Sequence, residues 1–134
     1  MASTRYHVRI DASADAVWDV VGRPERLHEW FPGITSCTVE GDQRTIVTGT
    51  GVPMPEQIIT RDDLLRRFQY RITAPAFRHH LGTIDVLDLG DGTCVVQYAT
   101  DAEPDVMALL IGGATLGALR ELQRQFEESE VRVG

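Results

Sequence analysis

The last quarter of the chain carries an apolar pattern of helical period that continues for several turns. Between Asp105 and Arg132, apolar residues recur at steps of three and four, as on one face of an amphipathic helix. Residues 34–101 instead predict short strands and tight turns. One long helix and one sheet must therefore cover each other. A narrow helix on a wide, bent sheet leaves an apolar hollow, which is the usual setting of a small-molecule site. The residues of the helical stripe are Val106, Met107, Leu110, Ile111, Ala114, Ala118, Leu122 and Phe126.

Length and charge exclude several classes of protein. The chain has 134 residues, enough for one domain with its own core, and we treat residues 1–134 as a single domain. All 13 basic residues are arginine and 20 residues are acidic, which gives a formal net charge of -7. This balance argues against a nucleic-acid partner. Because lysine is absent, Schiff-base catalysis and a phosphate-loop lysine are excluded.

The sequence predicts a cytoplasmic protein. Its longest apolar run, Met107 to Leu119, is shorter than the roughly 20 residues that a membrane span requires. The first residues lead directly into a strand pattern, which predicts no signal peptide. Cys37 and Cys94 lie in separate strand-like segments without metal-ligand spacing, so we expect two free thiols in a reducing compartment.

The remaining elements follow from alternation and from turn residues. Alternating apolar and polar residues predict a first strand that ends at Ile10. Two short helices follow, Ala14 to Val21 with Ser13 as N-cap and Pro24 to Trp30 with Pro24 at its first position. Short connections make the sheet antiparallel. The other six predicted strands are Ile34 to Glu40, Thr45 to Thr48, Glu56 to Arg61, Arg67 to Thr73, His80 to Leu89 and Thr93 to Thr100.

At this point the chain resembles a family. Its segment from Ile10 to Val21, followed by Pro24 to Trp30, is similar to the opening of the START-related, pollen-allergen and polyketide-cyclase (SRPBCC) superfamily. The resemblance covers nearly the whole chain. It implies the α+β helix-grip fold, in which a curved seven-stranded antiparallel sheet wraps around a long C-terminal helix, with two short helices after the first strand. That order of elements is the one predicted above.

Two shorter stretches resemble the plant abscisic-acid receptors of this superfamily. Gly51-Val52-Pro53-Met54 is similar to their gate loop, and His79-His80-Leu81 is similar to their latch. The two prolines and flanking glycines of Gly51 to Pro55 predict a stiff lid over the cavity mouth near His79. The receptors' hormone-binding lysine corresponds to Thr35 here, which argues against recognition of that hormone.

Alternation also predicts which side chains face the cavity. Phe68, Tyr70 and Ile72 alternate with polar residues and point inward, as do Ile84 and Val86. The resemblance adds Thr35, Ile46, Thr48, Gln57, Ile59, Gln97 and Ala99. Trp30 lies where it either plugs the open end of the fold or stacks on a ligand. The predicted ligand-binding set is Trp30, Thr48, Met54, Gln57, Ile59, Tyr70, Ile72, His79, Ile84, Gln97, Met107, Ile111 and Ala114.

Few residues are candidates for chemistry. The four histidines lack metal-ligand spacing, since His79 and His80 point to opposite faces of a strand, and we predict no metal and no cofactor. Tyr70, Glu56 and His79 are the candidates for proton transfer, and either His79 or His80 could serve as a general base. Glu56 serves only if it is desolvated.

Three functions remain open on the sequence. The first is binding of a small, largely apolar organic ligand, such as a lipid, a polyketide or an aromatic metabolite. The second, implied by the resemblance, is a polyketide cyclase or dehydratase that uses Tyr70, Glu56 or His79. The third is a non-catalytic protein that forms a homodimer through the start of the last helix, at Leu109, Leu110, Gly113 and Leu116.

Overall fold

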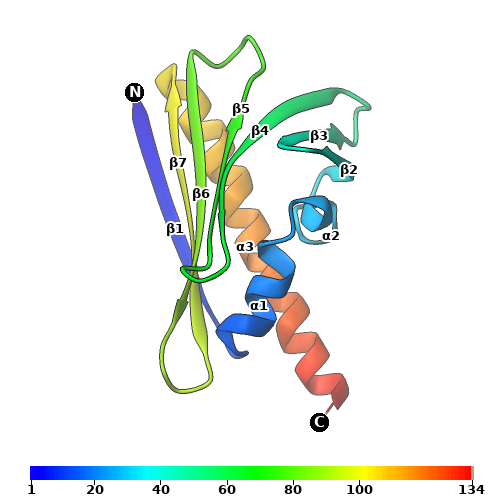
Figure 1. The fold of residues 1–134 in the computed structure, drawn as a ribbon, viewed down its shortest axis with the longest axis vertical. Coiled ribbons are helices and arrows are strands. Elements are labelled where there is room, and N and C mark those ends of the chain that lie inside the picture. The colour runs from blue at the N-terminus through cyan, green and yellow to red at the C-terminus, as the bar shows by residue number, and fades with distance from the viewer. Residues whose placement is uncertain (134) are drawn as a thin grey trace.

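The computed structural model describes residues 1–133, with side chains as far as residue 128. It contains seven strands and a long C-terminal helix, with short helices after the first strand (Figure 1). The predicted order of elements and the helix-grip fold are confirmed. The strands are β1 (Ala2–Ile10), β2 (Ile34–Glu40), β3 (Gln43–Thr48), β4 (Pro53–Asp62), β5 (Arg67–Ile72), β6 (His79–Asp88) and β7 (Cys94–Glu103). The helices are α1 (Ala14–Val21), the 3₁₀ turn η1 (Pro24–Arg26), α2 (Leu27–Trp30) and α3 (Asp105–Val133).

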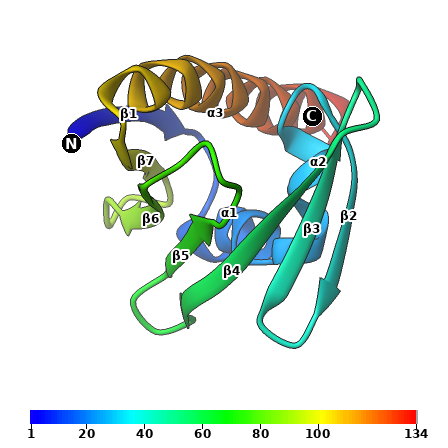
Figure 2. The same cartoon turned by 90° about the horizontal axis from the view of Figure 1, so that it is seen from above.

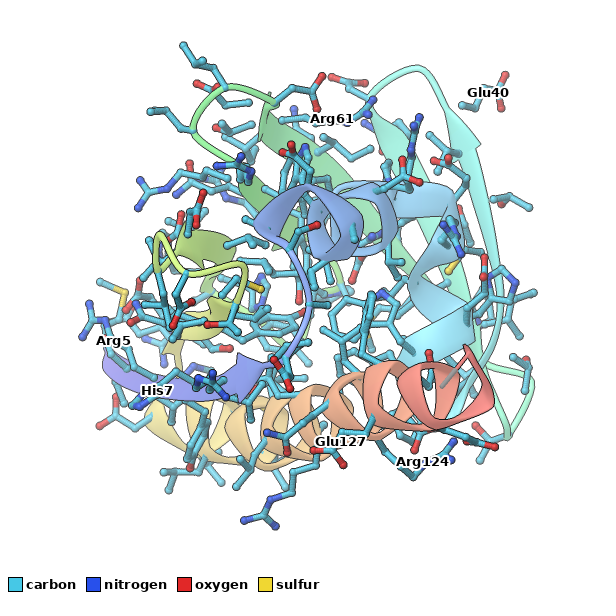
Figure 3. The ribbon with its side chains drawn as sticks, turned by 90° about the horizontal axis from the view of Figure 1, so that it is seen from below. Arg5, His7, Glu40, Arg61, Arg124 and Glu127 are labelled. Atoms are coloured by element: carbon cyan, nitrogen blue, oxygen red, sulfur yellow. The ribbon has the colours of Figure 1, made fainter. Side chains whose placement is uncertain are left out.

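The strands form one antiparallel sheet in the order β1-β7-β6-β5-β4-β3-β2. This sheet curves into a trough, and α3 lies across its open side (Figure 2). The helices α1 and α2 lie between the two halves of the trough. Charged residues of α3 such as Arg124 and Glu127 point away from the sheet (Figure 3). Apolar residues therefore face a common interior from both layers.

Alternation along the strands sets the inner face. Phe68 and Tyr70 of β5 and Ile84 and Val86 of β6 are all at least 97% buried. The register pairs Phe68 with Ile84, so the apolar residues of neighbouring strands lie side by side. The predicted inward set of these two strands is confirmed.

At the start of α3, the helix face that is buried differs from the predicted one. Val106 and Leu110 are exposed by 57% and 63%, whereas Ala108 and Thr115 are fully buried. Small residues face the sheet here because the helix lies very close to β1. A Cβ atom built on Gly112 would lie 2.6 Å from Oγ1 of Thr4. The prediction failed because it ranked positions by hydrophobicity, and a close contact between a helix and a sheet selects small side chains instead.

Two adjacent glycines of α3 give a matched test of this contact. We expect Gly112→Ala to lower the free energy of unfolding by about 1 kcal/mol, since overpacking costs roughly 1 to 3 kcal/mol and the gain in helix propensity offsets only part. Gly113 has open space around its Cβ position, so Gly113→Ala should stabilise the protein by up to about 1 kcal/mol. Urea denaturation measures both. Equal stabilisation by the two changes would contradict the close contact with β1.

Candidate functional site

A cavity of about 240 Å³ lies between the sheet, the first half of α3 and the segment that joins α2 to β2. Its walls are mostly apolar. The sheet contributes residues from β3, β4 and β5, and α3 contributes two residues one turn apart. The lining residues are Leu27, Phe31, Pro32, Gly33, Ile34, Ile46, Thr48, Met54, Glu56, Tyr70, Ile72, Ile111 and Ala114.

A buried ion pair lies on the inner face of β3 and β4. Nε of Arg44 donates to Oε1 of Glu56 at 2.6 Å, and both side chains are about 97% buried or more. Nη1 of Arg44 donates to the carbonyl oxygen of Pro24, and its guanidinium lies over the rings of Phe68 and Tyr70. Nη2 has no hydrogen-bond partner in the described chain. Burial raises the pKa of the Glu56 carboxyl, and Arg44 opposes that rise only in part.

Two tyrosines form a second buried polar pair beside the first. The hydroxyl groups of Tyr70 and Tyr98 are hydrogen-bonded to each other. Burial raises the pKa of both hydroxyls above the usual range, so both remain protonated at neutral pH. Gly82 makes room for this arrangement, because a Cβ there would lie 2.5 Å from the Tyr70 ring. Tyr70 also lines the cavity.

His80 lies next to these tyrosines and is 1% exposed. Its Nδ1 accepts a hydrogen bond of 2.9 Å from the backbone N–H of Ile72. An accepting Nδ1 places the proton of the neutral ring on Nε2, which is buried without a partner in the described chain. Burial, helped by His79 and Arg71, lowers the pKa of His80 to about 4.

Seven residues of the predicted site line the cavity. Three of them, Thr48, Met54 and Ile72, lie on the sheet beside Glu56 and Tyr70. Ile111 and Ala114 face them from α3. The predicted residues that line the cavity therefore come from both of its sides, the sheet and α3.

The structure places two residues of β4 on the opposite face of the sheet. Gln57 pairs with the exposed Arg71, and Ile59 is 43% exposed. The register with β5 shifts between Ile58 and Thr60. In this strand Glu56 and Ile58 take the inner positions, so the predicted alternation of β4 was wrong by one residue.

Other predicted residues also lie outside the cavity. Gln97 pairs with Asp85 and His7 on the outer face, between the fully buried Val96 and Tyr98. Ala99 pairs with Thr83 on that same face, and Thr35 is exposed. These positions were assigned by resemblance, and the local register overrides that assignment.

Trp30, Ile84 and Met107 are near the interior without lining the cavity. Trp30 and Ile84 are each 1% exposed and belong to the hydrophobic core. Met107 is half-buried at the start of α3. The sequence identified these three as inward-facing and did not distinguish packed core from cavity wall.

Of the two adjacent candidate histidines, His80 faces the interior and His79 does not. His79 is half-buried and alternates with His80, so it lies on the outer face of β6, opposite Glu103 of β7. His80 is the inward-facing imidazole. The alternation of β6 itself carries this information, because His80 shares its parity with Ile84 and Val86.

The segment predicted as a lid is mostly strand. Pro53, Met54 and Pro55 belong to β4 and pair with Val47, Ile46 and Thr45 of β3. The turn of this hairpin is fixed to the start of β2 by a hydrogen bond of 2.9 Å from Gly49 N–H to the Gly33 carbonyl. The loop prediction failed because proline is compatible with a strand where its nitrogen needs no partner. Pairing of β4 with β5 begins only at Glu56, so Pro53 and Pro55 lie at a local edge of the sheet.

The sequence analysis missed Arg44 and Tyr98. Arg44 has the same parity as Ile46 and Thr48, so alternation along β3 could have placed it inside. Because it is charged, Arg44 was expected to lie in solvent, and only the pairing of β3 with β4 places Glu56 opposite it.

Within the described residues, no group of three or more His, Cys, Asp or Glu side chains could hold a metal ion. No described helix is long and apolar enough to cross a membrane.

The fold is that of a helix-grip protein, with a mostly apolar cavity between the sheet and α3. The family model described as "Polyketide cyclase / dehydrase and lipid transport" matches residues 1–128, and the chain belongs to this family. The resemblance to the SRPBCC superfamily is thereby confirmed. Among curated proteins none matches this chain.

Solved structures show the same fold. Protein XoxI from Bacillus cereus is 26% identical, with a TM-score of 0.90 over 97% of this chain and 99% of its own. A START superfamily protein from Mycobacterium smegmatis is 18% identical, with a TM-score of 0.78 over 94% of this chain and 97% of its own. Norcoclaurine synthase from Thalictrum flavum, in complex with dopamine and hydroxybenzaldehyde, is 18% identical, with a TM-score of 0.73 over 95% of this chain and 87% of its own.

Proposed function

We propose that this protein binds a small, largely apolar organic ligand in the cavity between the sheet and α3. The observation that carries the proposal is the apolar cavity itself, lined from both layers by residues such as Ile72 and Ile111. Lipids, polyketides and aromatic metabolites are the classes that suit such walls.

Both cysteines are free, which supports a reducing cytoplasmic location.

The volume limits the size of the ligand. Ligand pockets commonly measure roughly 300 to 1,000 Å³, and an apolar cavity of roughly 150 Å³ is enough for benzene. A cavity of about 240 Å³ therefore suits one substituted ring, a small fused pair or a short chain. Norcoclaurine synthase, which shares this fold, holds single-ring compounds. A long unfolded polyketide chain would require expansion of the cavity.

Filling the cavity tests the proposal. Ala114 lines the cavity from α3 and is itself exposed, so it lies at the cavity mouth, and Ala114→Trp should block binding of naphthalene, used as a probe, while the domain stays folded. In a solid core the same change would overpack and cost roughly 1 to 3 kcal/mol or more. Equilibrium dialysis measures binding and thermal unfolding measures stability. Leu109→Trp, on the exposed side of α3, is the matched control and should leave both unchanged.

A clear loss of melting temperature in Ala114→Trp, with no naphthalene binding in the parent, would contradict the proposal. If the parent does bind naphthalene, native mass spectrometry of protein purified from its own host would detect the natural ligand. The exact mass of the bound molecule limits its elemental composition.

A second candidate is an enzyme of the cyclase or dehydratase type. It is favoured by the presence of Glu56 and Tyr70 on the same cavity wall, both buried and both with raised pKa. Glu56 would accept a proton and Tyr70 would donate one as water leaves the substrate. His79 is left out of this candidate, because it lies on the outer face of β6. If it holds, the ligand recovered from Tyr70→Phe should be heavier by one water than that recovered from the parent.

A third candidate is a homodimer formed through the exposed leucines at the start of α3. Leu109 and Leu110 are exposed by 67% and 63%, and Gly113 beside them is exposed as well. Leu116 is half-buried and contributes less. Sedimentation equilibrium separates this candidate from the others, since a change of Leu109 to Glu would shift only a dimer toward the monomer mass.

A further inference from the structure

One polar side chain on the cavity wall has an atom with no partner. The hydroxyl of Thr48 is hydrogen-bonded to that of Thr50 at 2.9 Å, and the hydroxyl of Tyr70 to that of Tyr98. Glu56 uses only Oε1, which accepts from Arg44. Within the described residues its second oxygen, Oε2, has no hydrogen bond. Glu56 lines the cavity, and Oε2 is the part of its carboxylate that remains open to a ligand.

The positive member of the ion pair lies behind the negative one. Arg44 does not line the cavity, and its guanidinium is engaged by Glu56, by the Pro24 carbonyl and by the faces of two aromatic rings. The cavity therefore meets the carboxylate side of the pair. Charges interact strongly where water is excluded, so a second carboxylate placed here would be repelled and desolvated. A neutral donor would instead give Oε2 its missing hydrogen bond.

We propose that the ligand is a neutral molecule with a hydroxyl group, a phenol or an alcohol, which donates a hydrogen bond to Oε2 of Glu56, and that carboxylate ligands are rejected. This inference rests on the proposed binding function. The apolar walls receive the body of the ligand and Glu56 fixes its orientation. The other polar groups of the cavity wall already have partners and contribute little to selection.

Three probes that share the naphthalene ring system test the inference: naphthalene, 2-naphthol and 2-naphthoic acid. Equilibrium dialysis of the whole protein at pH 7 should show 2-naphthol bound at least about tenfold more tightly than naphthalene, as expected for a hydrogen bond to a charged acceptor. Naphthoate should bind more weakly than naphthalene. Equal affinities for naphthol and naphthalene, or a preference for naphthoate, would overturn the inference while leaving the cavity as a binding site.

Variants assign the preference to a residue. Glu56→Gln should reduce the preference for 2-naphthol to about threefold or less, and Glu40→Gln, the matched control at an exposed position outside the cavity, should leave it intact. Loss of the preference in Thr48→Val, with the preference kept in Glu56→Gln, would make Thr48 the recognising group and overturn the inference. If Glu56→Gln does not fold, the order of affinities of the three probes for the parent protein still tests the inference. Probe binding that survives Ala114→Trp unchanged lies outside the cavity and would refute the proposed function itself.

Discussion

Replacement of Glu56 by leucine is expected to lower the free energy of unfolding by about 3 to 5 kcal/mol. The change leaves the guanidinium of Arg44 buried, charged and without its 2.6 Å partner. Arginine cannot relieve this by losing its proton, because its pKa is too high. Urea denaturation at pH 7 measures the loss.

The double variant Arg44→Met/Glu56→Leu should recover most of that stability. It replaces both charges by apolar side chains of similar volume, and such replacements are often neutral or stabilising. Asp19→Ala is the matched control, because it breaks the exposed pair with Arg23, and it should cost less than about 1 kcal/mol. A double variant as unstable as Glu56→Leu would show that packing around the pair, and not the stranded charge, determines the loss.

The second large effect is a loss of stability in mild acid that depends on His80. Its pKa is about 6.5 in the unfolded chain and about 4 in the folded protein, where burial disfavours the charged ring. Between these pH values the unfolded chain holds a proton that the folded protein does not. Stability therefore falls as the pH falls from 6.5 to 4, by about 3 kcal/mol in total.

His80→Asn should remove most of this slope. The asparagine oxygen can accept the hydrogen bond from Ile72 in place of Nδ1, and the new side chain does not titrate. Glu56 acts in the opposite direction, since its raised pKa favours the folded state as the pH falls, so the comparison must be between parent and variant. NMR titration of the imidazole gives an independent reading. A midpoint near 6.5 in the folded protein would contradict the burial of His80.

Much of the fold follows from patterns that are local in sequence. Alternation in β5 and β6 determines which side chains face inward, and the cap at Ser13 starts α1, where the N–H of Ala16 donates to its Oγ at 3.1 Å. The sheet side of the cavity follows from the same rule, because Tyr70 and Ile72 share the inner face.

The errors arise where one element adjusts to another. The irregularity at Ile59 changes the alternation of β4 beyond Ile58 and depends on the pairing with β5, whereas the error at Gln57 lies before it. The close contact at Gly112 rotates the buried face of α3 toward small residues. The partnership of Arg44 with Glu56 needs the register between β3 and β4. None of these is visible in the residue types of a single segment, so Glu56 and Tyr70 were predicted while their buried partners, Arg44 and Tyr98, were missed.

A ligand bound in the mostly apolar cavity would supply part of the hydrophobic core from outside the chain. A ligand seated between β5 and α3 would add contacts that no side chain provides, and these exist only in the folded state. At a free ligand concentration of about 100 times Kd, this linkage would add about 2.7 kcal/mol to the free energy of unfolding. The abundance of the protein in a cell would then follow the supply of its ligand, because unliganded molecules unfold and are degraded more often.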